Sequence, residues 1–294
     1  MTNRGQFAQL LATGMQEVMF EWLKDHPEEY SQFCEVGTTS SAYEDDQIIA
    51  GLGTARRKLE GEPITYDDPI QGPTKRYISE RYALGWQVTE EMLEDEKYGI
   101  MKQIPGELIS SCRQTWEQVG AQPLNLGFTT LLTADGVSLF NTAHPLLGGG
   151  TYSNRAATPM DVSETGLQDA ALSFENMVNE RGLKKRLGAD KLWIPPQLQF
   201  ITAKVLQSTL QPGTGNNDIN TMKGRFEAAI LHFLTSTTAW FVSSSEHNKV
   251  KFLWRKKPVT GAQDDFETGG TKHKISFRIA VGATDWRGWY ASNP

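Results

Sequence analysis

Residues 51–88 restrict what this chain can fold into more than any other stretch of it. Glycine and proline interrupt the stretch and leave short extended runs at 55–59, 64–66 and 75–88. An isolated two-stranded hairpin is marginally stable in water, and this one has too few apolar residues to build a core of its own. We therefore expect it to be ordered only where it lies on another surface. The interrupting residues are Gly51, Gly53, Gly61, Pro63, Pro69, Gly72 and Pro73.

The same stretch is polar and mixed in charge. Between residues 56 and 76, five bases face four acids. The last run alternates in character from Tyr82 to Val88, as a half-buried strand would. The pattern indicates a long, charge-mixed hairpin. Its bases are Arg56, Arg57, Lys58, Lys75 and Arg76, and its acids are Glu60, Glu62, Asp67 and Asp68.

The first segment of the chain has the spacing of an amphipathic helix that ends before Pro27. Residues 1–50 carry nine acids against Arg4 and Lys24. A terminal helix with one apolar stripe must dock on something, and both its own domain and a neighbouring subunit satisfy that need. The stripe consists of Phe7, Leu10, Leu11, Met15, Val18, Met19, Trp22 and Leu23.

The remainder of the sequence predicts separate helices and strands. A long helical stretch follows Thr89 and ends before Pro123, with Pro105-Gly106 expected to break or kink it. A further helix is predicted over 163–181, and Pro195-Pro196 opens another. Helices and strands in separate runs make the fold class α+β. The predicted strands are 191–194, 226–233, 240–243, 249–255 and 275–281.

Length and composition exclude several classes of protein. The 294 residues suit one large domain or two intertwined ones. The net charge of -6 argues against a dedicated nucleic-acid binder, whereas a mildly acidic wall suits a container for DNA. Hydrophobic residues are few (38%) but Trp is frequent (8), so we expect large anchors between subunits, a loop-rich monomer being the alternative.

Neither cysteine chemistry nor a membrane segment is expected. Cys34 and Cys112 match no metal-ligand spacing and are predicted to be two buried thiols rather than a disulfide. Polar residues interrupt the first apolar run, so no secretory signal is predicted. No stretch approaches 18 apolar residues, the length that a membrane span needs.

His144 is the most tempting catalytic candidate, because Asp135 and Ser138 lie close to it in sequence. One short loop rarely aligns all three groups of a triad, so we favour a histidine that hydrogen-bonds a turn. The glycines at 148–150 lack the lysine of a phosphate-binding loop, and the histidines have no zinc-site spacing. The basic string at 249–257 is interpreted as a strand with one wet face rather than a nucleic-acid patch. We expect no catalytic, cofactor or metal site.

Four segments together identify a family. They are DGVSLFNTAHPLLGGGTYSN at 135–154, LWIPPQLQFITAKVLQS at 192–208, GNNDINTMKG at 215–224 and AWFV at 239–242. These strings resemble the major capsid proteins of tailed bacteriophages, and the first half of the chain agrees with that family mainly in layout. The resemblance implies the Hong Kong ninety-seven type fold.

On that resemblance the chain divides into five parts. These are an N-terminal arm (1–50), an extended loop (51–88), a peripheral domain with a spine helix (89–134 and 252–294) and an axial domain (135–251). The candidate intersubunit contacts are Phe7, Leu11, Trp22, Arg56, Arg57, Lys58, Asp67, Asp68, Lys75 and Arg76.

The implied function is a shell without enzymatic activity. Hexamers and pentamers of the chain would form an icosahedral head that encloses double-stranded DNA with weak, non-specific contact. The expected partners are further copies, a portal protein and a separate scaffolding or decoration protein, with no cofactor and no membrane. The expected place is the virion, after assembly in the host cytoplasm. The lysine, asparagine and acid that cross-link some relatives have no match here, so we expect non-covalent assembly.

Three alternatives stay open at the level of sequence. An encapsulin-like cellular compartment would hold a cargo peptide instead of DNA. A hydrolase using His144 would lose turnover in His144→Ala. A tail or decoration protein would be structural without forming closed shells. Electron microscopy of the purified or co-expressed chain distinguishes these hypotheses, because only a shell protein forms closed shells.

Overall fold

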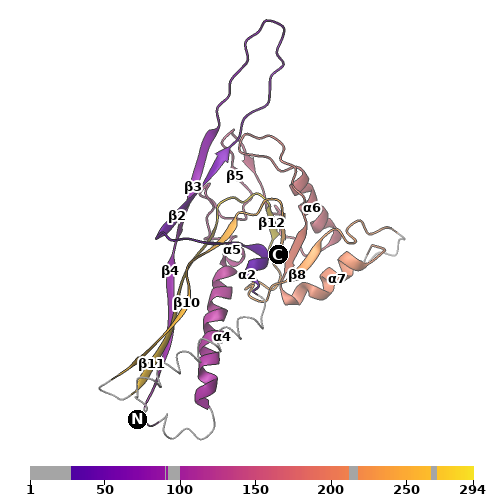
Figure 1. Ribbon diagram of the computed structural model, residues 1–294. Helices are drawn as coiled ribbons and strands as arrows, with labels where there is room; N and C mark the ends of the chain where they lie inside the picture. The colour runs from indigo at the N-terminus through magenta and orange to yellow at the C-terminus, as the bar shows by residue number, and fades with distance from the viewer. Residues whose placement is uncertain (1–27, 90, 92–99, 212–217, 266–269) are drawn as a thin grey trace.

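The structure is a computed structural model that describes residues 28–89, 91, 100–211, 218–265 and 270–294 (Figure 1). The amphipathic helix predicted for the first segment lies outside the described residues, as do its candidate contacts Phe7, Leu11 and Trp22. In the described part, no helix is long and apolar enough to cross a membrane.

A four-stranded sheet forms one half of the molecule, in the order β1-β10-β11-β4. β1 pairs with β10 in parallel, and the other two pairs are antiparallel. The predicted strands 249–255 and 275–281 lie inside two longer strands, which form a hairpin. The bounds are β1 (Glu35–Thr38), β4 (Glu80–Val88), β10 (Val250–Asp264) and β11 (Thr271–Ala283).

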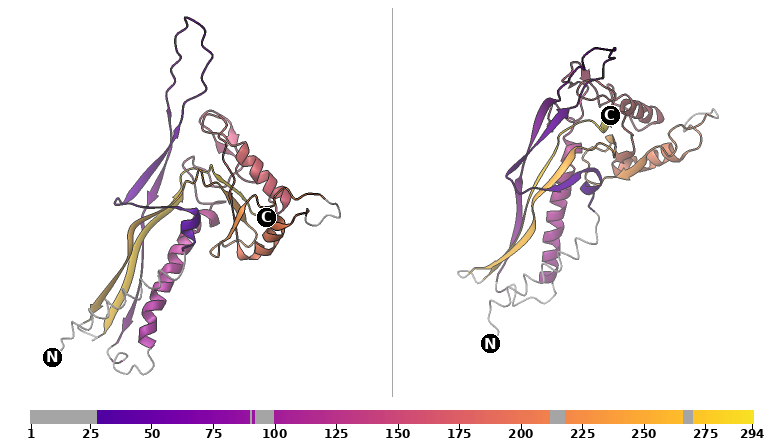
Figure 2. Two further views of the ribbon diagram at one scale, coloured as in Figure 1. Left: turned by 45° about the vertical axis from the view of Figure 1, so that its right-hand side comes forward. Right: turned by 45° about the horizontal axis from the view of Figure 1, so that its top comes forward.

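Helix α4 (Ile100–Gly120) lies along one face of this sheet (Figures 1 and 2). Alternate residues of β11, such as Phe277, are buried on this face, and the Trp116 ring of α4 meets Phe277 edge-on at 5.5 Å. α4 is continuous through Pro105-Gly106, so the predicted break is wrong. Proline in a helix costs about 3 kcal/mol, and burial of the α4 side chains outweighs that cost. Those side chains are Leu108, Ile109, Cys112, Trp116 and Val119.

The second sheet has the order β12-β9-β7-β8, and two helices pack beside it. β7 (Lys191–Ile194) and β9 (Trp240–Ser243) have the predicted bounds. Ser163 caps α6 as its spacing indicates, accepting from the Gly166 amide at 3.1 Å, but the helix ends at 175 and not at 181. The other elements here are β8 (Glu227–Ile230), β12 (Trp289–Ser292), α6 (Glu164–Glu175), η1 (Pro196–Leu198) and α7 (Gln199–Gln207).

Several short elements connect these two halves. They are α2 (Tyr30–Phe33), α5 (Gln122–Asn125), β5 (His144–Pro145) and β6 (Thr151–Tyr152).

A two-stranded ribbon projects from the body (Figures 1 and 2). β2 (Tyr43–Ala50) pairs antiparallel with β3 (Ile70–Ile78), and residues 51–69 join them at the far end. The ribbon therefore begins eight residues before the predicted boundary at 51. The runs at 55–59 and 64–66 are not strands. We call residues 43–78 the extended loop.

Both sheets share one hydrophobic core, which contains most of the tryptophans. The expectation that the Trp-rich composition marks intersubunit anchors is therefore wrong for six of the eight, five of them fully buried and the sixth, Trp254, 7% exposed. Cys34 and Cys112 are free and buried, as predicted. The five fully buried tryptophans are Trp116, Trp193, Trp240, Trp286 and Trp289.

Candidate functional site: the extended loop and the polar centre at its root

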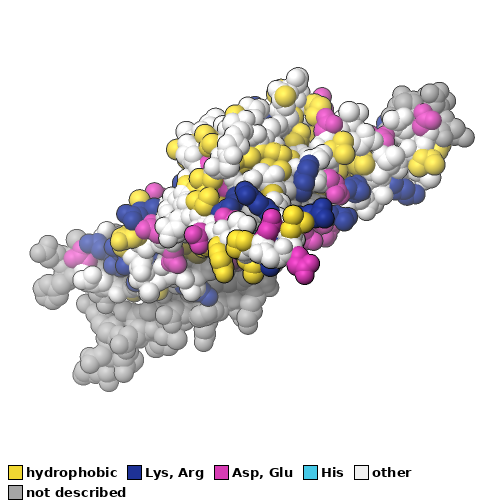
Figure 3. All heavy atoms as spheres, turned by 90° about the horizontal axis from the view of Figure 1, so that it is seen from above, with side chains coloured by type: hydrophobic (Ala, Val, Ile, Leu, Met, Phe, Trp, Pro, Cys, Tyr) yellow, Lys and Arg dark blue, Asp and Glu magenta, His cyan; other side chains and the backbone are white. Residues whose placement is uncertain are grey.

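The far part of the extended loop is exposed throughout. Every residue from 51 to 70 is exposed, and Tyr66 keeps 89% of its surface in contact with solvent. Viewed along the projection, apolar and charged side chains are interspersed on the described surface (Figure 3). Exposed apolar groups gathered on one element mark an interaction surface. Those of the extended loop are Tyr43, Ile49, Leu52, Leu59, Ile64, Tyr66, Ile70 and Ile78, and five of them lie between 51 and 70.

The root of the extended loop, in contrast, is fixed to the first sheet. Tyr77 is buried against Leu253 and Ala280, and its hydroxyl lies 2.5 Å from Thr284 Oγ1. That threonine donates to Asp46 Oδ2 at 2.6 Å, and Lys251 Nζ lies 2.6 Å from the same oxygen. Although partial burial opposes it, these hydrogen bonds from Lys251 and Thr284 hold the pKa of Asp46 below its usual value. A buried polar network thus fixes both strands where the ribbon leaves the body.

A second attachment lies further out along the loop. Arg181 Nη1 is 2.7 Å from Asp67 Oδ2, and Arg181 Nη2 donates to the Asp68 carbonyl. The Gly53 amide donates to the same Asp67 oxygen at 2.6 Å. The Gly53 amide and the Arg181 guanidinium hold the pKa of Asp67 below its usual value. We call Arg181, Asp67, Asp68 and Gly53 the clasp, because it joins both sides of the ribbon to the body.

His144 is enclosed and has no access to a substrate. It is 0% exposed and stacks on Trp286 at 4.5 Å. Its Nδ1 lies 2.6 Å from Asp135 Oδ2 and its Nε2 lies 3.1 Å from Asn154 Oδ1. Ser138 accepts from the Asn141 side chain and donates to the Phe140 carbonyl, without meeting the imidazole. The triad is therefore not assembled, and the prediction of a histidine bonded to a turn is confirmed.

A buried polar centre lies behind the root of the loop. Arg287, with 2% of its side chain exposed, pairs with Glu180 at 2.7 Å and Asp285 at 3.0 Å. Asp285 also bonds His247, whose other nitrogen lies 3.1 Å from Lys185 Nζ. Burial raises the pKa of Asp285, but the bond from His247 and the charge of Arg287 outweigh it and leave the pKa below its usual value. Burial lowers the pKa of Lys185. These charges pair with one another, as structural charges do.

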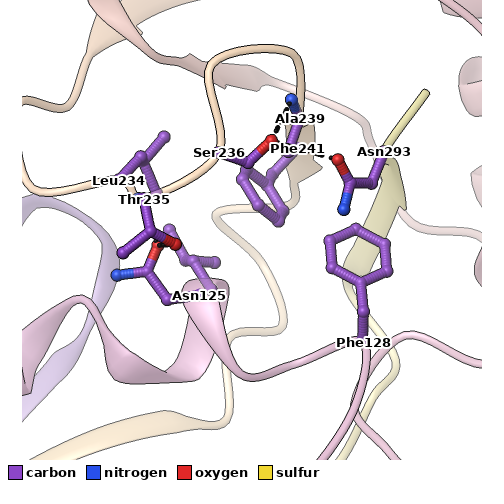
Figure 4. A pocket seen from close by; sticks show the side chains of 9 residues that line it. Asn125, Phe128, Leu234, Thr235, Ser236, Ala239, Phe241 and Asn293 are labelled. Carbon is purple, nitrogen blue, oxygen red and sulfur yellow. Dashed lines mark hydrogen bonds between the residues drawn. The ribbon is translucent and has the colours of Figure 1, made fainter.

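The described cavities are unsuited to a substrate. One of about 20 Å³ lies between Asn125, Phe128, Ser236 and Asn293 (Figure 4). That volume holds about one water molecule, and Ser236 already donates to Asn293 at 3.0 Å. A groove of about 210 Å³ separates the loop root from the polar centre and is lined by charges that are mostly paired, including Asp46, Glu180 and Asp285. In the groove, the Thr284 hydroxyl is held between Tyr77 and Asp46 as part of the network at the root of the loop.

A family model described as phage capsid protein matches residues 72–292, most of the chain. The chain belongs to the phage capsid protein family. No curated protein matches it.

Solved capsid structures share the fold of this capsid protein over nearly its whole length. The Microbacterium phage Oxtober96 structure superposes with a TM-score of 0.60 at 12% identity, covering 92% of this chain and 91% of that chain. The capsid of a native GTA particle gives 0.62 at 9% identity, covering 90% and 89%. The procapsid of bacteriophage JBD30 gives 0.56 at 15% identity, covering 99% and 76%. The predicted fold, of the Hong Kong ninety-seven type, is confirmed. The protein is a structural component of a phage capsid shell, in which it associates with itself.

The capsid protein places its predicted contact residues in two groups. Arg56, Arg57 and Lys58 are exposed on the projecting part of the loop, and no ion pair of theirs occurs within the described ranges. The other four have partners in the same chain. Asp67 and Asp68 belong to the clasp, Lys75 Nζ donates to the Leu132 carbonyl at 2.7 Å, and Arg76 makes two 2.7 Å bonds to Asp45.

Sequence reasoning did not find the residues that hold the loop to the body of the capsid protein. Arg181 lies 114 positions from Asp67, and Thr284 lies 207 from Tyr77. No local spacing or periodicity connects residues so far apart. Charge offered the one available signal, since Asp67-Asp68 is an exposed acidic pair in need of a partner.

Proposed function

We propose that this capsid protein assembles non-covalently into hexamers and pentamers that form the icosahedral head of a tailed phage and enclose its double-stranded DNA. The observation that carries the proposal is the extended loop, whose far part from 51 to 70 is exposed throughout and bears five large apolar side chains. In a monomer the apolar side chains of this ribbon stay exposed to water, which is unfavourable. In a shell, neighbouring copies can bury them.

The energetics favour assembly despite the acidic charge. Obligate interfaces bury roughly 2,000–5,000 Å², and apolar area contributes about 25 cal/mol per Å². Repulsion between subunits of net charge -6 is screened beyond roughly 8 Å at physiological salt. The free energy gained by burying the loop's apolar groups therefore outweighs the electrostatic repulsion between subunits.

The remaining parts of the proposal follow the family resemblance. The arm, without the residues 43–50 that belong to the extended loop, the two peripheral parts (89–134 and 252–294) and the axial domain (135–251) keep their expected roles. The portal and a separate scaffolding or decoration protein are the further partners, and assembly takes place in the host cytoplasm. Phe7, Leu11 and Trp22 stay candidate contacts of the arm. The candidate contacts of the loop stay Arg56, Arg57, Lys58, Asp67, Asp68, Lys75 and Arg76.

Electron microscopy of the co-expressed full chain tests the proposal. We expect closed shells from the native sequence and none from Ile64→Asp/Tyr66→Asp, which places charge where apolar contact is needed. Thr65→Asp is the control, because it adds one negative charge between those two residues without removing apolar surface. Closed shells from the double variant would contradict the role of the loop. Shells that hold a cargo protein and no DNA would indicate a cellular compartment.

A further inference from the structure

Helix α6 has one exposed face along its whole length. Its opposite side is buried, with Leu167 and Phe174 in the core. Leu172 on the exposed side keeps 58% of its surface in contact with solvent. Residues three and four positions apart lie on the same side of a helix, so the exposed positions form one continuous row. We call this row the α6 face, and it consists of Thr165, Asp169, Leu172 and Asn176.

Helix α7 has a second exposed face. Val205 and Leu206 are buried, whereas Phe200 is 79% exposed and Ile201 is 48% exposed. Among the large apolar side chains that the structure describes, only Tyr66 of the extended loop is more exposed. Apolar groups that gather in this way mark an interaction surface. The α7 face consists of Gln197, Ile201, Lys204 and Ser208, with Phe200 beside Ile201.

The two faces belong to separate parts of the subunit. α6 and α7 lie apart at two edges of the second half of the molecule (Figures 1 and 2), so neither face covers the other within one chain. Over the described ranges, Asp169 and Lys204 form no ion pair. Since the protein associates with itself in a capsid shell, a second copy is the partner that is always at hand.

The α6 face matches the α7 face when the two helices run antiparallel. Asp169 precedes Leu172 by three positions, and Ile201 precedes Lys204 by three positions. Both pairs therefore span about 4.5 Å along the helix axis. When Leu172 lies opposite Ile201, Asp169 lies opposite Lys204. In a parallel arrangement, the same apolar contact would place Asp169 opposite the apolar Leu198.

The match continues to both ends of the faces. Four positions further along in each direction, Asn176 lies opposite Gln197 and Thr165 lies opposite Ser208. Amides and hydroxyls both donate and accept hydrogen bonds, so each of these pairs can bond. Phe200 lies next to the apolar pair and supplies the aromatic anchor on which protein interfaces are commonly centred.

We infer that the α6 face of one copy packs antiparallel on the α7 face of the next copy. The inference deepens the proposed function, on which it rests, by naming two surfaces that join neighbouring copies. Because the two faces differ, each copy uses α6 toward one neighbour and α7 toward the other. Such a head-to-tail contact closes into a ring where the rotation between copies allows it, as hexamers and pentamers require.

Disulfide cross-linking of assembled shells tests the inference. In Leu172→Cys/Ile201→Cys, the antiparallel contact brings thiols of neighbouring copies together, while the native Cys34 and Cys112 are buried. Leu172→Cys/Gln207→Cys is the matched control. Gln207 lies six positions after Ile201, about 9 Å along the helix, whereas a disulfide requires Cα atoms within about 7 Å. Oxidised shells are boiled in SDS without reductant and compared on a gel.

We expect a ladder of bands up to five and six subunits from Leu172→Cys/Ile201→Cys and the monomer band from the control. A monomer band alone from both variants, or equal ladders from both, would overturn the inference. A ladder that stops at the dimer would also overturn it, because like surfaces would then meet across a two-fold axis.

Charge exchange gives a second measurement that does not depend on the cysteine variants. Asp169→Lys and Lys204→Asp each place like charges opposite one another, and we expect each to lower the yield of closed shells several-fold. Asp169→Lys/Lys204→Asp should restore the yield, and circular dichroism verifies the folding of each variant. Native yields from both single variants, or no recovery in the exchanged variant, would overturn the inference. Absence of closed shells from the native chain would instead contradict the proposed function itself, so the two failures are distinguishable.

Discussion

Arg181 and Asp67 lie 114 positions apart in sequence, yet their side chains meet at 2.7 Å and join the extended loop to the body of the subunit. The contact is specific in geometry, because a second guanidinium nitrogen bonds the neighbouring Asp68 carbonyl. It is also partly exposed, with 45% of the Asp67 side chain open to solvent. An exposed ion pair contributes little to global stability. We therefore expect the clasp to set the position of the loop rather than to hold the fold.

Breaking the clasp should free the loop without unfolding the subunit. In Arg181→Met, we expect amide hydrogen exchange in residues 51–69 to become several-fold faster, since local opening no longer breaks the clasp. Exchange in β10 and β11 should stay unchanged. Arg186→Met, which removes an arginine whose side chain is 87% exposed, serves as the control. Unchanged exchange in 51–69 would show that the root alone positions the loop.

The same contact should depend on pH in a defined direction. The Gly53 amide and Arg181 depress the folded-state pKa of Asp67 below that of the unfolded chain. A depressed carboxyl stabilises the folded contact at higher pH and loses that contribution as pH falls through the folded pKa. The protection of residues 51–69 against hydrogen exchange, relative to the intrinsic rate at each pH, should therefore fall in acid, and Asp67→Asn should abolish this dependence. A native-like acid response in Asp67→Asn would assign the effect to another group.

Removal of the Tyr77 hydroxyl should weaken the root of the loop by a measurable amount. Tyr77→Phe keeps the ring on Leu253 and Ala280 but deletes the bond to Thr284. We expect a loss of about 1 kcal/mol in the free energy of unfolding, the usual value of a buried hydrogen bond. Tyr77→Ala should cost about 3–5 kcal/mol, because it also leaves a cavity. Urea unfolding measures the loss of stability in both variants. Equal losses would refute the view that the ring and the hydroxyl of Tyr77 contribute separately.

His144 should matter for folding and not for chemistry. Both of its ring nitrogens face acceptors, because the Asn154 amide nitrogen is turned away to the Leu139 carbonyl. A side chain that is bonded through two ring nitrogens has no isosteric replacement. His144→Gln should lose about 2–4 kcal/mol of unfolding free energy by leaving buried groups unsatisfied. His232→Ala, where the side chain is 66% exposed, should stay within about 1 kcal/mol of the native chain.

Glu117 should make the subunit less stable as pH rises toward neutrality. It is buried in α4 and accepts from the Glu29 and Tyr30 amides at 3.2 Å each. Burial raises its pKa to about 7, from 4.5 for an ordinary glutamate. The folded chain therefore holds the proton more tightly than the unfolded chain, and this contribution to stability is lost between about pH 4.5 and about pH 7.

Glu117→Gln removes that titration and keeps an acceptor oxygen for one of the two amides, so it lowers stability at every pH but leaves no pH dependence from this position. Unfolding free energies at about pH 5 and about pH 8 should differ less in Glu117→Gln than in the native chain. Glu107→Gln, an exposed position on the same helix, should behave like the native chain. The assignment to Glu117 fails if the two variants share one pH dependence.

The sequence predicted those elements whose causes are local. The bounds of β7 follow from an apolar run stopped by Pro195-Pro196, and the start of α6 follows from the Ser163 cap. Pro105-Gly106 misled the prediction for α4, because burial of side chains such as Trp116 outweighs the cost of proline in the helix. The continuity of α4 thus depends on tertiary packing, which no local sequence pattern indicates.

The extended loop was predicted in kind but not in extent. Its far part is recognisable from mixed charge and frequent glycine and proline, which need no knowledge of the rest of the chain. Its true start at Tyr43 depends on pairing with Ile78, and its clasp depends on Arg181. Both are long-range contacts. The same reason explains why tryptophans expected between subunits, such as Trp193, lie in the core of one chain.

β3 and β4 are separated by Ser79 alone. The ribbon that reaches outward is thus not tethered by a pliant linker but continues, within one residue, into the edge of the sheet that packs against α4. Since no flexible residues separate the two strands, a displacement of the ribbon's tip also displaces β4 and, through it, the first sheet of the subunit. Binding of a neighbouring subunit to the ribbon would consequently change the position of the edge strand β4 in the subunit that carries the ribbon.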